Sequence, residues 1–162
     1  MIKMQNKQDC CGCASCVQRC PKHCISMKED SEGFLYPVID ESICINCGLC
    51  EKICPVINQP EKLPVIEVLA AKNRNEVERM ASSSGGVFIA LAKETIENGG
   101  VVFGAVYDEN WEVKHTYAET IDEIKPMMDS KYLQSRIENS FLDAERFLKQ
   151  VVKCCLQVHL AK

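Results

Sequence analysis

The sequence lacks a long hydrophobic run, which bears on where the chain resides. Its longest apolar stretch, Val101–Tyr107, has the length of a β-strand, whereas a helix needs ~20 apolar residues to cross a bilayer. The first nine residues are polar and hold no apolar core of a secretory signal. We therefore expect a cytoplasmic chain with no membrane span.

The sequence also lacks an excess of positive charge. It has 19 Lys and Arg against 23 Asp and Glu, for a formal net charge of -4. This charge weighs against nucleic acid as a partner, because binding to a phosphate backbone needs a basic surface. It suits docking to a basic patch on a redox partner protein, although an acidic surface also simply keeps many proteins in solution.

Cysteine, in contrast, is abundant and regularly spaced. Twelve Cys are present, and eight of them form two C-x2-C-x2-C-x3-C-P runs that end at Pro21 and Pro55. This is the bacterial ferredoxin spacing, in which thiolates hold [4Fe-4S] clusters. The repeated pattern predicts an electron-transfer protein that binds two such clusters.

The spacing also predicts which thiolates share a cluster. Three closely spaced Cys reach three irons of a cube, and the fourth Cys of each run ligates the other cluster. One expected ligand set is Cys10, Cys13, Cys16 and Cys54, and the other is Cys44, Cys47, Cys50 and Cys20.

Two alternatives concern these cysteines. Cys-x2-Cys pairs also build structural zinc sites, so a zinc-stapled interaction module without redox activity is an alternative, although zinc sites usually use pairs and not triplets. Cys11 and Cys24 lie outside the ligand spacing. We expect them to pack as small apolar residues.

We expect an α+β chain with four segments. They are a ferredoxin-type domain at 1–58, a linker at 59–64, a partial α/β domain at 65–150 and an atypical tail at 151–162. Apolar runs around Glu32-Gly33 predict a β-hairpin across 25–40. Beyond the linker, hydrophobic patterns predict strands at 65–71, Val101–Tyr107 and Val113–Ala118, and helices at 87–98 and 139–149 with Leu91 and Leu148 on their apolar faces.

A short Ser-Gly segment precedes the first of these helices. Its residues are Ser82-Ser83-Ser84-Gly85-Gly86. Hydroxyls and free N–H groups at the positive end of a helix bind phosphates. Serine is also a favoured helix cap, so from the pattern alone capping is the better supported role.

The order of motifs resembles the coenzyme F-420 hydrogenase/dehydrogenase beta-subunit family. The motifs are the two Cys runs, Ser82-Ser83-Ser84-Gly85-Gly86-Val87-Phe88, Gly100-x-Val102-x-Gly104-Ala105 with Tyr107-Asp108, and Ser130-Lys131-Tyr132-x-Gln134-Ser135. The family consists of flavoproteins that move electrons between clusters, FAD and a partner. The resemblance implies that Ser83, Ser84, Gly85 and Gly86 line a flavin region and that Lys131 meets its phosphates or ring. Asp129 stands where the family often has Gly.

The tail departs from the family. After Gln150 the chain reads Val151-Val152-Lys153-Cys154-Cys155 and ends seven residues later. A two-nucleotide shift of frame permits the strand and Gly-x-Pro-Cys-Gln turn of the family, so we interpret the tail as a frameshift product of a longer protein. The alternative is a natural short protein whose tail forms a last strand with Cys154 and Cys155 buried.

These features favour an iron-sulfur electron-transfer protein with a redox partner protein or flavin domain. The alternatives are a subunit that passes electrons between FAD and the clusters, and the zinc module. We propose no catalytic residue.

Overall fold

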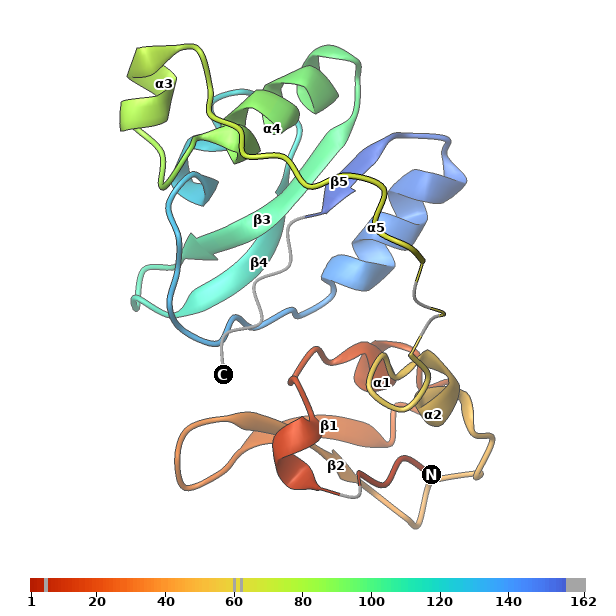
Figure 1. The fold of residues 1–162 in the computed structure, drawn as a ribbon. Coiled ribbons are helices and arrows are strands. Elements are labelled where there is room, and N and C mark those ends of the chain that lie inside the picture. Colours follow the sequence, from red (N-terminus) through yellow and green to blue (C-terminus); the bar gives the residue numbers. More distant parts are fainter. Residues whose placement is uncertain (5, 60, 62, 157–162) are drawn as a thin grey trace. The chain divides into compact units, whose positions relative to one another are not determined.

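The computed structural model describes every residue except 5, 60, 62 and 157–162. The chain divides into two compact units, Met1–Leu63 and Pro64 onward (Figure 1). In the described residues, no helix combines the length and the apolar character that a membrane span requires.

The first unit contains a β-hairpin and two short helices. Strands β1 (Ile25–Glu29) and β2 (Leu35–Ile39) pair antiparallel, with Ile25 opposite Ile39. The Asp30 carboxylate accepts hydrogen bonds from the backbone N–H groups of Glu32 and Phe34, which closes the turn. The predicted hairpin is therefore confirmed.

The two helices of this unit each carry the third cysteine of a run. They are α1 (Ser15–Gln18) and α2 (Leu49–Ile53), and both begin after a residue with positive φ, Ala14 at 56° and Gly48 at 73°. A short 3-10 turn, η1 (Lys7–Asp9), precedes the first run. Both runs therefore fold alike, as a tight loop that leads into one helical turn.

The core of the first unit is built largely from cysteine. Its buried residues are Ile2, Cys16, Cys20, Cys24, Ile25, Cys50 and Cys54, so five of the seven are Cys. Aliphatic and aromatic side chains supply most of the burial energy in ordinary cores. A domain of this size with so few of them needs another source of stability, which the predicted clusters would supply.

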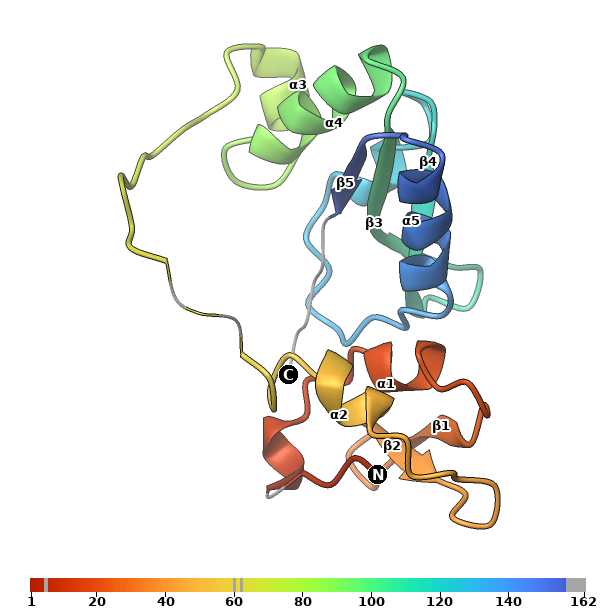
Figure 2. The same cartoon turned by 90° about the vertical axis from the view of Figure 1, so that its right-hand side faces the viewer.

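The second unit is a three-stranded sheet between two helices. The strand order is β4-β3-β5, where β3 (Val101–Tyr107) pairs antiparallel with β4 (Val113–Ala118) and parallel with β5 (Cys154–Leu156). Helices α4 (Val87–Glu97) and α5 (Ser140–Lys149) cover opposite faces (Figure 2). The α+β prediction and both long strands are confirmed.

Alternation along β3 assigns the two faces of this sheet. Val102 packs with Ile89 and Ala92 of α4, whereas Phe103 packs with Phe147 of α5. The short turn η2 (Lys125–Met127) adds Met127 to the α4 side.

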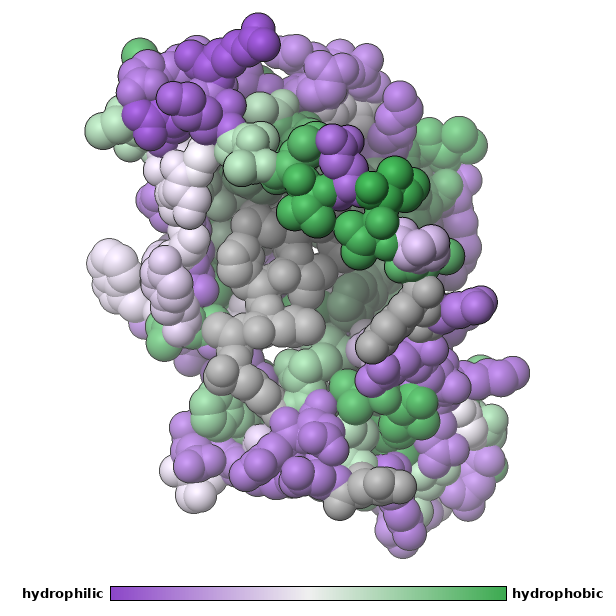
Figure 3. Space-filling model, in the orientation of Figure 1, coloured by the Kyte–Doolittle hydropathy of each residue, from purple (hydrophilic) through white to green (hydrophobic). Residues whose placement is uncertain are grey.

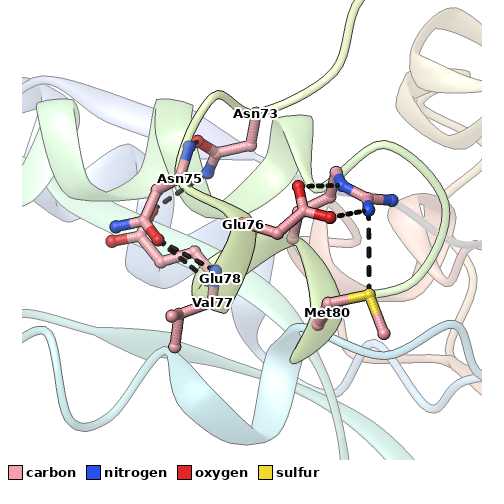
Figure 4. Close-up of polar contacts among 7 residues, drawn as sticks. Asn73, Asn75, Glu76, Val77, Glu78 and Met80 are labelled. Carbon is pink, nitrogen blue, oxygen red and sulfur yellow. Dashed lines mark hydrogen bonds and ion pairs between the residues drawn. The ribbon is translucent and has the colours of Figure 1, made fainter.

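Helix α3 (Glu76–Met80) is held by polar contacts (Figure 4). The Asn75 side chain accepts from the N–H groups of Val77 and Glu78, and the Asn73 amide donates to Glu78 at 3.0 Å. Lys93 of α4 also donates to Glu78, at 2.6 Å. The contact between Lys93 and Glu78 joins α3 to α4.

The strand predicted at 65–71 is wrong. This segment has no regular structure, and Ile66 and Val68 are 99% and 86% exposed. A strand is stabilised by pairing with a neighbouring strand. The outer edge of β4 is partly occupied, because Lys114 forms a β-bridge with Arg136. The apolar composition of the segment therefore does not make it a strand.

The apolar faces predicted for α4 and α5 are also partly wrong. Leu91 and Leu148 are 57% and 60% exposed, whereas Ile89 and Phe147 are buried. The three-stranded sheet covers a narrow stripe of each helix. Apolar residues beside that stripe therefore face solvent.

The tail is described as far as Leu156, within β5. Cys154 and Cys155 are half-buried and pack against opposite faces of the sheet. The remaining tail residues lie outside the described ones. The frameshift interpretation stays a prediction, and the nucleotide sequence after codon 150 tests it.

Candidate iron-sulfur centre and a second candidate site

The two cysteine runs approach each other inside the first unit. A small cavity is lined by Cys10, Cys13, Cys16 and, from the other run, Cys54. Cys11, Ile2 and Met4 also line it. Thiols of both runs therefore surround one space, the arrangement that crossed ligation requires.

The thiols of the other predicted set differ in exposure. Cys20 and Cys50 are buried, Cys44 is half-buried and packs against the same core, and Cys47 is exposed. No three Cys, His or carboxylate side chains among the described residues converge as ligands of a single metal ion.

Cys24 lies in direct contact with a predicted ligand. Its Sγ atom is 3.4 Å from Sγ of Cys20, and both side chains are buried. The expectation that Cys24 packs as a small apolar residue agrees with its burial, although its contact is with sulfur.

Burial lowers the acidity of one thiol in this centre. The pKa of Cys16 rises to about 12 because the thiol is desolvated, and the neighbouring Cys13 and Cys10 raise it further. Metal ligands must be thiolates, so cluster binding by the predicted ligand Cys16 would require the loss of this proton.

The Ser-Gly segment of the second unit is joined to the loop before Lys131. The Ser83 N–H donates to the carbonyl of Met128 at 3.4 Å, and the hydroxyls of Ser83 and Ser130 are 3.0 Å apart. The structure therefore brings together two motifs that lie 47 residues apart in sequence.

Lys131 is enclosed in the protein. Its side chain is 3% exposed, and Nζ donates to the carbonyls of Pro126 and Asp129 at 2.5 and 2.8 Å. Burial lowers the pKa of the ammonium, and the Asp129 carboxylate partly offsets this effect. The lysine side chain is thus held in place next to Ser130, the residue that contacts Ser83, and two of its three N–H donors are already used.

The two glycines of the segment serve internal packing. A Cβ at Gly85 would lie 2.6 Å from the carbonyl oxygen of Ala71, and one at Gly86 would lie 3.1 Å from Cα of Arg79. Gly86 also has φ of 64° and caps α4. Close backbone packing therefore explains both residues without a ligand, and Ser84, with φ of 53°, completes the turn.

We expect Gly85→Ala to destabilise the second unit. The new methyl group meets backbone at 2.6 Å, and the clash should lower the free energy of unfolding by about 1–3 kcal/mol. Denaturant titration of the complete chain measures the change. The transition to observe is the unfolding of the sheet that contains β3 and β4. Glu97→Ala at the exposed end of α4 is the control, and equal midpoints for both variants would contradict the packing described.

One buried group was missed by the sequence interpretation. The sequence near His115 shows no acidic or cysteine partner, but the side chain is 3% exposed and its Nδ1 lies 2.6 Å from the hydroxyl of Ser135. Only strand pairing and the return of the chain after Lys131 bring these residues together, so no local pattern reports the pair.

Comparison with known proteins connects this geometry to a family. A family described as "4Fe-4S dicluster domain" matches residues 9–58. A ferredoxin of Alicyclobacillus acidocaldarius is 42% identical over 65 residues, which cover 38% of this chain and 77% of the relative. The chain belongs to the dicluster ferredoxin family.

Membership of this family indicates which cofactor the domain binds and which reaction it carries out. The ferredoxin domain binds two [4Fe-4S] clusters through its cysteines and transfers electrons. The match is to an iron-sulfur family, which favours clusters over the zinc alternative.

More distant relatives align with both units. A subunit of the F(420)H(2) dehydrogenase of Methanosarcina mazei is 23% identical over 94% of this chain and 47% of its own length. The coenzyme F420-dependent sulfite reductase of Methanocaldococcus jannaschii is 24% identical over 80% of this chain and 20% of its own length. The chain thus spans about half or less of these relatives.

Proposed function

We propose that the ferredoxin domain holds its clusters by crossed ligation. One cluster takes Cys10, Cys13, Cys16 and Cys54, and the other takes Cys44, Cys47, Cys50 and Cys20. The observation that best supports this proposal is the cavity that is lined by cysteines of both runs. The clusters supply one-electron transfer when bound. The protein supplies the thiolates, the buried setting of Cys16 and Cys50, and the exposed position of Cys47.

We further propose that this chain is the electron-transfer part of an oxidoreductase related to beta subunits of flavin-dependent hydrogenases and dehydrogenases. The similarity to the M. mazei dehydrogenase runs through both units and is not confined to the ferredoxin domain. The electrons would pass between the clusters and a redox partner protein or flavin domain. A reducing compartment such as the cytoplasm suits this function, because cysteines that ligate clusters must not be oxidised to disulfides.

A second candidate function is flavin binding in the second unit. The link between Ser83 and Ser130 supports it, because it joins the start of α4 to the loop that carries Lys131. Both elements favour an anion, one through helix N–H groups and the other through a fixed ammonium. Ser84, Gly85 and Gly86 would then line the same region through their backbone.

Lys131→Met tests this candidate. Methionine keeps the length of the buried side chain and removes the charge, so the affinity for added FAD should fall about tenfold, as for loss of one charged contact. Binding is measured by quenching of flavin fluorescence with the purified holo-chain. Lys125→Met, at an exposed position paired with Asp122, is the control. No binding by the unaltered chain, or equal binding by both variants, would contradict the proposal.

A further inference from the structure

The two cluster-binding loops share one spacing but differ in the residues between the ligands. Adding 34 to a residue number of the first run gives the equivalent in the second, so Cys10 corresponds to Cys44 and Cys13 to Cys47. Of the eight predicted ligands, all of which the structure describes, Cys47 is the exposed one. The equivalent Cys13 is half-buried.

Four apolar residues surround the ligands of the second run. They are Ile43, Ile45, Leu49 and Ile53, exposed by 48%, 58%, 36% and 45%, and we call them the isoleucine patch. The equivalent residues of the first run are Asp9, Cys11, Ser15 and Arg19, all of them polar or small. Because the spacing of the predicted ligands is the same in both runs, cluster binding does not require this difference.

The chain itself covers the first loop. Ile2 and Met4 of the N-terminal segment line the cavity together with Cys11, which is half-buried. The equivalent of Cys11 is Ile45, the most exposed member of the patch. Thus the first loop has an apolar cover from within the unit, while the second loop presents its own apolar residues to solvent.

Figure 3 shows hydrophobic surface on the first unit in the region of α1, α2 and the loop that follows α2. Four exposed apolar side chains lie between residues 43 and 53, around an exposed ligand, and so are not scattered singly over the unit. Aliphatic residues gathered in this way mark the centre of an interface, where a partner excludes water.

Charge around the patch narrows the kind of partner. Asp40 and Glu41 precede it, Glu51 lies within it and pairs with the N-terminal ammonium at 3.5 Å, and Lys52 is the one Lys or Arg between residues 40 and 58. An oxidised cluster with four thiolates adds roughly -2 to this region. A complementary face therefore has an apolar centre and a basic rim.

Resting on the electron-transfer function proposed above, we propose that the isoleucine patch is the docking face for a basic redox partner protein, with electron transfer through Cys47. The transfer is of a single electron: the reduced cluster behind Cys47 loses it and the cofactor of the partner gains it. No bond is made or broken and no proton is needed. The apolar contact brings the exposed ligand within a short distance of the partner, and the carboxylates orient the approach.

Cytochrome c, a basic haem protein whose haem edge is surrounded by lysines, is the probe. Its oxidised form is titrated into the oxidised holo-chain, so that binding is read by calorimetry while no electron moves. Its reduction by the dithionite-reduced holo-chain is then followed by stopped flow. For Ile45→Ser we expect the dissociation constant to rise, and the bimolecular rate to fall, by about tenfold, and for Ile45→Val both should remain within twofold.

Val38→Ser is the matched control, because Val38 is an aliphatic residue of the same unit with 43% exposure and lies on β2. Iron content of every variant is measured first, so that loss of a cluster is not taken for loss of docking. Unchanged binding by Ile45→Ser would overturn the proposal, and so would equal weakening by Val38→Ser. Self-association that Ile45→Ser abolishes, with cytochrome c binding unchanged, would assign the patch to a second copy and also overturn it.

Discussion

Cys54→Ala is expected to weaken or remove the cluster held by the first run, although Cys54 belongs to the second run. Its thiol lines the cavity with Cys10, Cys13 and Cys16. Loss of the fourth ligand should expel the cluster or leave three irons, so the iron content falls from about eight to about four or seven per chain. Uncrossed ligation would instead damage the site of Cys44, Cys47 and Cys50.

The location of the damage is read by alkylation. A brief exposure to an iron chelator releases the weakened cluster first, and mass spectrometry then identifies the thiols that react. In Cys54→Ala we expect Cys10, Cys13 and Cys16 to react before Cys44 and Cys47. The reverse order would contradict crossed ligation.

The reciprocal variant needs a second substitution. Cys24 lies 3.4 Å from Cys20, sulfur to sulfur, close enough to replace it as a ligand. Cys20→Ala is therefore combined with Cys24→Ser, and Cys24→Ser alone is the control. In the combined variant the thiols of the second run should react first.

Removal of iron is expected to unfold the first unit and to leave the second folded. Five of the seven buried core residues of the first unit are Cys, whereas the second unit has cores built on Val102, Phe103 and Phe147. Without the clusters, the first unit lacks the apolar burial that a ~60-residue domain needs.

Hydrogen exchange of the holo-chain, before and after anaerobic chelation, measures this effect. Protection of β1 and β2 should fall about a hundredfold or more, while protection of β3 and β4 stays within about threefold. The second unit is thus an internal control. Equal loss in both sheets, or an unchanged β1–β2 hairpin, would show that the clusters do not stabilise the first unit selectively.

The sequence predicts the parts of this protein in which local pattern decides the structure. The two cysteine runs, the turn after Asp30, and the strands Val101–Tyr107 and Val113–Ala118 are each set by spacing or by alternation of neighbouring residues. The family match at residues 9–58 agrees with the two-cluster prediction.

The errors arise where distant parts of the chain decide the outcome. The apolar segment at 65–71 has strand composition, but its side chains are exposed and no described strand pairs with it. Leu91 fits a helical apolar stripe, yet the sheet packs against Ile89 instead. His115 gains Ser135 as its neighbour through folding alone. Which segments pair with each other, and not their composition, determines whether these residues are buried or in contact.

Iron, zinc and acid-labile sulfide, measured on the anaerobically reconstituted chain together with EPR of its reduced form, test the central claim most directly. Two [4Fe-4S] clusters predict about eight irons and eight sulfides per chain, and a spectrum of two interacting spins. Zinc without labile sulfide, or four irons with the spectrum of a single isolated cluster, would contradict a two-cluster electron-transfer domain.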